Sequence, residues 1–481
     1  MIFVVILKII SVLLAIVGTT YLIPIITAIS FKEFSYIIYF LIPMIFSWIL
    51  CLSVYVSTKK IKIHLSTKLT FAVVALAWIF TSVFAAIPFY SSGAIPSFTD
   101  AFFESVSGFT TTGASIVQNI EALPKCMNML RALTHWLGGM GIVALTVALL
   151  PILGVGGFQL IKAETTGPEK GKVTPKITTT AKALWTIYFV LTVLETILLM
   201  LFGMNFYEAL CHSFSTLGTG GFSTRNESVK AFNSAGIDIV ITIFMFLAGI
   251  NFSLYYHLFK GKFREIKENS ELKAYFFIVL IFTFLIAIFI LPDYKNFAES
   301  LRYSAFNVLT IMSTTGFANA DYTQWAMPAQ FLLFILFIIG GCSGSTAGGI
   351  KVIRLVILGK KIKTDMKKMI HPRGVFTIRI NKHPANPDLH SSVSTFIAVY
   401  FILITFTCFA GCLFGLDIFT SLTGAMSMTG NVGPAFGKLG PVFNYAWISP
   451  ALKWIYSFSM LSGRLELFTI LIFLSPDYWK K

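Results

Sequence analysis

The stretch SVSGFTTTGAS at residues 105–115 has three counterparts later in the chain. These read SFSTLGTGGFST at 213–224, VLTIMSTTGFAN at 308–319 and GAMSMTGNVGPAF at 424–436. Aligned on one glycine, the stretches bring together the triplets Thr111-Thr112-Gly113, Thr219-Gly220-Gly221, Thr314-Thr315-Gly316 and Asn431-Val432-Gly433. These glycines lie 108, 95 and 117 residues apart, which is too long for a solenoid repeat. The intervals suit a unit made of a span, a re-entrant hairpin, a second span and a cytoplasmic linker.

The composition is that of a membrane protein. Of the 481 residues, 56% are hydrophobic and 12% are charged, whereas soluble proteins carry about 25% charged residues. This excludes a soluble enzyme, a disordered chain and a nucleic-acid-binding protein of the usual kind. Runs of about 20 apolar residues can cross a bilayer, and ten are present, at 3–29, 36–57, 70–92, 132–155, 183–203, 237–257, 274–292, 328–356, 392–415 and 446–475.

We therefore predict an all-α polytopic membrane protein with about ten transmembrane helices and four re-entrant pore hairpins in a pseudo-fourfold arrangement. Two leading helices (1–66) precede unit 1 (67–178), unit 2 (179–270), unit 3 (271–390) and unit 4 (391–481).

Basic residues mark every second connection. The segments 58–69, 162–182, 260–273 and 351–390 hold 4, 5, 5 and 10 Lys or Arg residues. By the positive-inside rule these segments are cytoplasmic, and both termini are then cytoplasmic as well. The basic segments can act as topological signals alone, although the stretch 360–382 could also dock a partner.

Each hairpin opens with a short helical piece that carries an acid: Asp100, Glu208, Glu299 or Asp417. An acid there complements the positive end of a helix dipole. It would also add negative charge to an outer vestibule and attract cations. Simple helix capping is the alternative explanation.

A second set of four recurs in the descending spans. The stretches HWLGGMGIV (135–143), MFLAGINFS (245–253), FIIGGCSGS (337–345) and SMLSGRLEL (459–467) align on Gly139, Gly249, Gly341 and Gly463. Small residues at one depth allow close helix contact, which is the structural alternative for this set. Two sets of four in register indicate a genuine fourfold repeat.

The first set suggests an ion filter. Non-helical backbone at membrane depth survives only where it is buried in protein or lines a water-filled cavity. Carbonyl oxygens there can replace an ion's hydration shell, and no carboxylate lies inside the triplets, which favours a monovalent cation. The predicted filter residues are Thr110, Thr111, Thr112, Gly113, Gly218, Thr219, Gly220, Gly221, Ser313, Thr314, Thr315, Gly316, Gly430, Asn431, Val432 and Gly433.

The third unit contains a weak point in its descending span. Its residues 340–349 are the poorest helix formers in any span, since glycine costs about 1 kcal/mol relative to alanine in a helix. We predict a broken helix whose loop can lie across the pore. Arg464 aligns with this depth, where a charge usually faces the protein interior or water, and a buried pair with Glu466 is the alternative. The predicted gate residues are Gly340, Gly341, Gly344, Ser345, Thr346, Gly348, Gly349 and Arg464.

The leading spans, the four filter stretches, GGCSGSTAGGIKVIR (340–354) and SGRLEL (462–467) together resemble the TrkH family of bacterial Trk-type potassium uptake membrane subunits. That family belongs to the superfamily built from four fused span–pore–span units. The resemblance implies potassium as the transported ion, because a glycine in all four filter units goes with potassium selectivity. It implies a gating loop in unit 3, with Arg464 as a fixed positive charge below the filter.

The resemblance also implies location and partners. We expect a multi-pass protein of the bacterial inner (plasma) membrane, a homodimer and a cytosolic nucleotide-binding regulatory subunit (TrkA-like). Ion symport occurs in this superfamily, and the residues do not identify a coupling ion. We expect no organic cofactor and no nucleic acid.

Two alternatives stay open. The first is the sibling Ktr-type sodium-dependent potassium transporter, which sodium dependence of uptake would distinguish. The second and more remote is an intramembrane serine protease, because Gly341-Cys342-Ser343-Gly344 matches GxSG. Such an enzyme needs a histidine base on another span, and no later span carries one. We therefore expect that the chain is not an enzyme.

Overall fold

The computed structural model describes residues 2–59, 66–141, 177–374, 376–381, 383–384 and 387–480. The described chain is helical apart from one antiparallel pair of short strands, β1 (Arg379–Ile380) and β2 (His383–Pro384), in which Arg379 pairs with Pro384. The predicted all-α class is therefore confirmed. The second part of the predicted span 132–155 and most of the predicted linker 162–182 lie outside the described residues.

Helices occupy the predicted leading segment and each of the four predicted units. The leading helices are α1 (Ile2–Thr20), α2 (Leu22–Ser30) and α3 (Ile37–Ser57). The predicted unit 1 holds α4 (Thr67–Ser91), α5 (Phe98–Phe109) and α6 (Lys125–Gly139). The predicted unit 2 holds α9 (Ile177–Leu201), α10 (Phe206–Gly218), α11 (Ala235–Ala248), α12 (Phe252–Phe259) and α13 (Phe263–Glu268).

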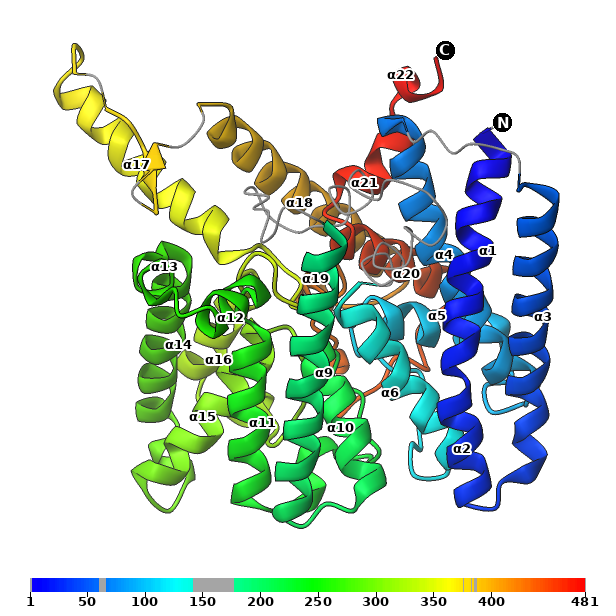
Figure 1. The fold of residues 1–481 in the computed structure, drawn as a ribbon. Helices are drawn as coiled ribbons and strands as arrows, with labels where there is room; N and C mark the ends of the chain where they lie inside the picture. Colours follow the sequence, from blue (N-terminus) through cyan, green and yellow to red (C-terminus); the bar gives the residue numbers. More distant parts are fainter. Residues whose placement is uncertain are drawn as a thin grey trace.

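The second half of the chain repeats this plan. The predicted unit 3 holds α14 (Ser270–Phe289), α15 (Phe297–Met312), α16 (Met327–Leu336) and α17 (Val352–Ile370). The predicted unit 4 holds most of α18 (Pro387–Leu413), which begins at the end of the predicted unit 3, and all of α19 (Ile418–Gly430), α20 (Pro450–Arg464), α21 (Phe468–Leu471) and α22 (Pro476–Trp479). In Figure 1, α17 extends away from the bundle on the side where both chain ends lie.

Six helices in the described part of the chain are long and apolar enough to cross a membrane. Two further candidates are bent pairs, α11 with α12 at 91° and α20 with the segment Phe468–Leu474 at 113°. The predicted run 328–356 is interrupted as expected, because α16 ends at Leu336 and α17 begins at Val352. The ten predicted runs therefore include spans that are not continuous helices.

The structure also contains breaks in the predicted units 2 and 4, where the sequence predicts continuous spans. In unit 2, the Asn251 side chain accepts the Ser253 N–H at 2.9 Å and starts α12 in a new direction. In unit 4, Glu466 and Leu467 both have φ of 57°, a left-handed conformation that ends α20. These breaks depend on one or two residues each and carry no run of glycines.

The short helices α5, α10, α15 and α19 each pack between two other helices of their own unit, and α5, α10 and α15 also pack against a neighbouring unit. The descending helix α6 packs on α10 of the next unit, α11 packs on α15, and α20 packs on α5. The units therefore interlock, and the predicted filter lies among the ends of the four short helices.

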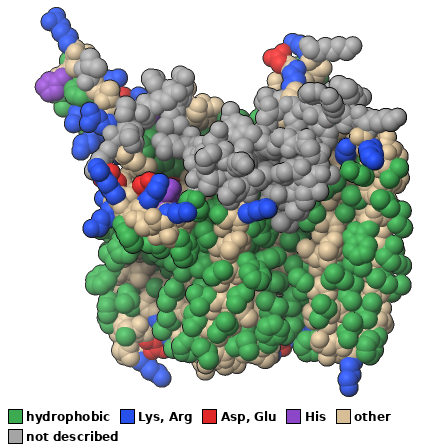
Figure 2. Space-filling view, in the orientation of Figure 1, with side chains coloured by type: hydrophobic (Ala, Val, Ile, Leu, Met, Phe, Trp, Pro, Cys, Tyr) green, Lys and Arg blue, Asp and Glu red, His purple; other side chains and the backbone are tan. Residues whose placement is uncertain are grey.

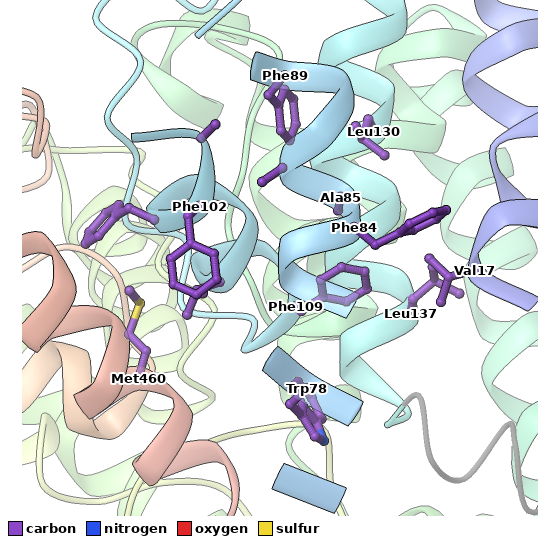
Figure 3. Close-up of a cluster of buried hydrophobic side chains, with 14 of the residues drawn as sticks. Val17, Trp78, Phe84, Ala85, Phe89, Phe102, Phe109, Leu130, Leu137 and Met460 are labelled. Carbon is purple, nitrogen blue, oxygen red and sulfur yellow. The ribbon is translucent and has the colours of Figure 1, made fainter. Parts of the chain in front are cut away.

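Two hydrophobic clusters support this arrangement. One joins α1, α4, α5, α6 and α20, with Trp78, Phe109 and Met460 among its buried side chains (Figure 3). The other joins the helices from α9 to α19. Outward-facing residues are also apolar, for example Leu201 at 75% exposed, which suits contact with lipid. In Figure 2 hydrophobic side chains form a broad band, and Lys and Arg gather mainly on the side that holds both termini.

Candidate ion-conduction site

Each short helix begins with a side-chain cap. Ser97, Asn205, Asn296 and Asp417 accept the backbone N–H of the residue three positions on. In three units that later residue is the predicted acid, so Asp100, Glu208 and Glu299 lie in the first helical turn. Asp417 is itself the cap. The capping alternative therefore holds for Asp417, whereas the other three acids lie in the first turn, where they complement the helix dipole.

The prediction of an acidic outer vestibule is wrong for the cavity above the filter glycines. Among the described residues that line this cavity, the charged side chains are Arg131 and Arg225, and none is Asp or Glu. Two of the acids are held in ion pairs: Asp100 with Lys453 at 2.6 Å and Glu208 with Arg225 at 2.7 Å. A charge pattern along the sequence could not reveal these partners, which are remote or come from a loop.

The four short helices end in the same way. The residue two positions before each filter glycine has φ between 56° and 59°, at Thr111, Thr219, Thr314 and Asn431. The filter glycines themselves have φ between 76° and 98°, at Gly113, Gly221, Gly316 and Gly433. This alternation of left-handed residues places the four stretches in the register that the sequence alignment gave.

Repeated hydrogen bonds hold this conformation. The residue between the two left-handed positions donates its N–H to a carbonyl five residues earlier, at 2.8 to 2.9 Å, in the pairs Thr112–Ser107, Gly220–Ser215, Thr315–Thr310 and Val432–Ser427. Such bonds satisfy the free carbonyls at a helix C-terminus. The loops that follow, residues 110–113, 218–221, 313–316 and 430–433, are called the filter loops below.

The filter loops form a closed ring. A Cβ atom placed on each filter glycine would collide with a carbonyl oxygen of the next unit: Gly113 with Gly220, Gly221 with Thr315, Gly316 with Val432, and Gly433 with Thr112. The contacts therefore run from unit 1 through units 2 and 3 to unit 4 and back to unit 1. All four glycines also line one cavity of about 190 Å³.

This ring can coordinate a monovalent cation. It brings backbone carbonyls from four loops around one cavity, and no residue of the filter loops carries a charged side chain. The helices α5, α10, α15 and α19 all end at the ring, and the C-terminal end of a helix carries partial negative charge. A dehydrated cation at the centre would be surrounded by these partial charges.

Several hydroxyls of the filter loops hydrogen-bond within their own loop or to a neighbouring unit. The Oγ1 atoms of Thr110 and Thr112 lie 2.8 Å apart, and Ser313 Oγ lies 2.7 Å from Thr315 Oγ1. Asn431 Nδ2 donates to Thr112 Oγ1 at 3.0 Å and so joins unit 4 to unit 1. These side chains hold the loops in position.

An isolated parallel bridge between Ile339 and Ile350 brings together the two ends of the loop between α16 and α17. Gly340 N donates to Ile350 O at 2.9 Å, and Val352 N donates to Gly341 O at 3.1 Å. Glu271 of α14 bridges both arms, because its Oε1 accepts from Ser343 N at 2.6 Å and from Ile353 N at 3.0 Å.

The same loop touches the filter loops. Gly348 N donates to Thr314 Oγ1 at 2.7 Å, and a Cβ on Gly348 would collide with Gly430 O. On another side, Cys342 N donates to Gly249 O at 2.8 Å, at the bend between α11 and α12. The α16–α17 loop therefore contacts residues of the predicted units 2, 3 and 4.

Arg464 ties this loop to two other units. It donates from Nη1 to Thr346 O at 2.6 Å, and from Nη2 to Gly138 O at 2.6 Å and Gly139 O at 3.0 Å. Glu466 forms an ion pair with Arg354 of α17. The structure thus brings Arg464 to the predicted gate residues.

Glu271 and the buried pair Glu104–Arg131 were missed by the sequence analysis. Arg131 Nε lies 2.8 Å from Glu104 Oε1, and both side chains are at most 1% exposed. Arg131 also donates to Ser223 O of unit 2 at 3.3 Å. The available signal was that each of these charges stands in or beside an apolar segment, where charged residues usually have a function or a partner.

The TrkH family profile, described as "Cation transport protein", matches residues 37–481. The chain belongs to the TrkH family. It is 38% identical over 434 residues to the Trk system potassium uptake protein TrkH of Halomonas elongata, with 89% of each chain covered. It is 33% identical to the TrkH protein of Vibrio parahaemolyticus, with 99% of each chain covered.

A solved TrkH structure agrees with this assignment. The crystal structure of the potassium transporter TrkH from Vibrio parahaemolyticus matches the whole chain with a TM-score of 0.87 and 32% identity, and all of that chain is covered. These TrkH relatives are named as transport proteins. The chain is accordingly a multi-pass membrane transporter of the TrkH family and not an enzyme, and the protease alternative is set aside.

Proposed function

We propose that this chain is the membrane subunit of a potassium uptake system and conducts the ion through the ring of filter loops. The observation that carries the proposal is the closed sequence of contacts from Gly113 through Gly221 and Gly316 to Gly433 and back. The relatives at 33–38% identity are named for potassium uptake, and all four filter positions here are glycine.

Potassium enters the cavity above the glycines and loses water among the carbonyls of residues 110–113, 218–221, 313–316 and 430–433. Below them it meets the α16–α17 loop with the gate residues 340–349, which close the path together with Arg464. The contact of Gly348 with Thr314 supports this placement of the loop. Uptake is driven by the membrane potential, worth about 2.3 kcal/mol per charge for each 100 mV.

The chain works in the bacterial inner membrane with both termini in the cytoplasm. The gathering of Lys and Arg on the side of the termini supports this orientation, as the positive-inside rule requires. The functional units are 67–178, 179–270, 271–390 and 391–481, after two leading helices at 1–66. The active assembly is a homodimer with a cytosolic nucleotide-binding regulatory subunit (TrkA-like), and the basic segments, above all 357–382, form its docking face.

Rubidium uptake by the purified protein in liposomes tests the proposal. We expect uptake that excess potassium suppresses and excess sodium does not. Equal competition by sodium and potassium would contradict a potassium filter. Uptake that requires sodium on the same side would instead support the Ktr-type sodium-dependent alternative.

A further inference from the structure

The filter loop of unit 2 lacks a side chain that the other three possess. In the common register, the residue between the two left-handed positions is Thr112, Gly220, Thr315 or Val432. We call this residue the middle position. Only unit 2 has glycine there, and the φ of Gly220 is not in the left-handed region that would require glycine. Backbone conformation therefore does not explain this glycine.

In the other three units the side chain at the middle position anchors its loop by hydrogen bonds or by packing against the protein. Thr112 bonds to Thr110 and to Asn431, and Thr315 bonds to Ser313. Val432 is fully buried in the hydrophobic cluster that also contains Phe337 and Phe436. The loop of unit 2 needs an anchor from another part of the chain.

The imidazole of His135 occupies the missing place. A Cβ atom on Gly220 would collide with Cγ, Nδ1 and Cδ2 of the His135 ring. The ring is fully buried and stacks on Phe222 with 4.1 Å between ring centroids and 20° between planes. It therefore lies directly against the unit 2 loop, although His135 belongs to α6 of unit 1.

Hydrogen bonds connect this ring to both ends of the loop. His135 Nδ1 accepts the N–H of Phe222, which directly follows the filter glycine Gly221, at 3.4 Å. It also lies 3.3 Å from Oγ of Ser215, whose carbonyl accepts the N–H of Gly220. His135 Nδ1 thus contacts Ser215, which precedes the filter loop of unit 2, and Phe222, which follows it.

The position of α6 leaves the ring little freedom to withdraw. A Cβ on Gly138 would collide with Phe109 O, and one on Gly139 would approach Gly218 Cα at 2.5 Å. The helix is therefore pressed against the ends of α5 and α10. The aligned positions on the other descending helices are Met245, Phe337 and Ser459, so this imidazole has no counterpart there.

We infer that His135 is a positioning residue for ion selection, which supplies from unit 1 the anchor that the unit 2 filter loop lacks. The inference rests on the proposed potassium filter. Because carbonyl oxygens must replace the hydration shell of the ion, a loop that can shift would also adapt to the smaller sodium ion. Loss of the imidazole then lowers selectivity before it lowers total flux.

The test moves the anchoring side chain from residue 135 to residue 220. The variants are His135→Ala, Gly220→Thr and the double variant, measured as sodium-to-potassium permeability ratios from reversal potentials in planar bilayers. We expect His135→Ala to raise the ratio by about tenfold, the worth of one hydrogen bond of about 1.4 kcal/mol. Gly220→Thr alone abolishes flux because its side chain meets the ring. The double variant regains flux and a ratio near that of the wild type, because threonine anchors the loop from its own chain position.

Met245→Ala is the matched control. Met245 is fully buried at the aligned position of α11, and the neighbouring loop has its own anchor in Thr315. We expect a wild-type permeability ratio for this variant despite a similar loss of buried volume. His135→Phe keeps a flat ring and removes the nitrogen, and we expect it to share the raised ratio of His135→Ala.

A wild-type ratio in His135→Ala would overturn the inference, as would a double variant no more active or selective than Gly220→Thr. If His135→Ala does not fold, the flux and the permeability ratio of the double variant are compared with those of Gly220→Thr, and a double variant that regains neither overturns the inference. A wild-type protein that passes sodium as readily as potassium would overturn the proposed function itself, and this inference with it.

Discussion

Arg464 donates a hydrogen bond of 2.6 Å from Nη1 to the carbonyl oxygen of Thr346. Its other terminal nitrogen reaches Gly138 O and Gly139 O at the end of α6. One guanidinium from unit 4 therefore holds the α16–α17 loop of unit 3 against unit 1. In the proposed mechanism this arrangement is the closed gate, and the positive charge opposes the passage of cations through it.

Replacing Arg464 by alanine should open this path. The substitution removes three charge-assisted bonds, each worth about 1.5–3 kcal/mol, and we expect rubidium uptake into liposomes to rise by about tenfold or more. Uptake by Arg464→Lys should lie between that of the wild type and that of Arg464→Ala, because lysine lacks the planar fork of donors that arginine has. Arg264→Ala, at a side chain 85% exposed on α13, is the control and should leave uptake unchanged. Unchanged rubidium uptake in Arg464→Ala would contradict a role for Arg464 in the gate.

A pair of glycine variants separates backbone strain from crowding at the ring. Gly113 and Gly93 have similar φ, 78° and 74°, but a Cβ on Gly93 meets nothing within 4 Å. Both alanine variants should lose about 1 kcal/mol of stability from the left-handed conformation, as seen in thermal unfolding in detergent. Only Gly113→Ala should also abolish potassium-selective flux. Equal flux in the two variants would show that the ring tolerates a side chain.

The buried pair Glu104–Arg131 should be a major stabilising contact within unit 1, and Arg131 also bonds to Ser223 O of unit 2. Removing one partner of a buried ion pair costs about 3–5 kcal/mol, so Glu104→Gln and Arg131→Met should each strongly lower the unfolding temperature. The double variant should lose less than the two single losses combined, because no unpaired charge is left. Asp365→Asn, in a partly exposed pair with Lys361, is the control with little effect. Single variants that unfold at the same temperature as this control would contradict a stabilising role for the Glu104–Arg131 pair.

The helix cap at Asp417 should make stability depend on pH at the outer end of α19. Hydrogen bonds from Thr420, through its side chain and its backbone N–H, lower the pKa of the Asp417 carboxyl. A carboxyl whose pKa is lower in the folded state stabilises the protein above its unfolded value of about 4. That contribution falls away as pH drops through the folded pKa.

Comparison with Asp417→Asn isolates this effect, because asparagine also caps a helix but does not titrate. The wild type should unfold at a higher temperature than the variant at pH 7, and the difference should shrink below pH 4. All other acids titrate in both proteins. A difference that stays constant from pH 7 to pH 3 would contradict the role of the charge.

The fourfold register could be predicted because it is local. Thr111 and Gly113 have equivalents at the same spacing in every unit, and the left-handed φ values fall where the alignment placed them. The break at residues 340–349 was also predictable, since consecutive glycines disfavour a helix. The bends at Asn251 and Glu466 depend on a single cap or on two strained residues, which propensity does not reveal.

Contacts between units could not be predicted from the sequence. The partners Asp100 and Lys453 are 353 residues apart, and their pairing replaces the vestibule charge that the sequence suggested. Likewise, Gly220 looks like one more filter glycine until the ring of His135 is seen beside it. These contacts form only when the four units pack together, and the sequence alone does not show which residues then meet.

Anomalous X-ray diffraction from crystals grown in rubidium tests the central claim most directly, because it locates the ion and not only its passage. The account predicts a rubidium peak inside the ring, between the carbonyl oxygens of Thr112, Gly220, Thr315 and Val432. Bound rubidium found only elsewhere, with the ring empty at saturating concentration, would contradict it.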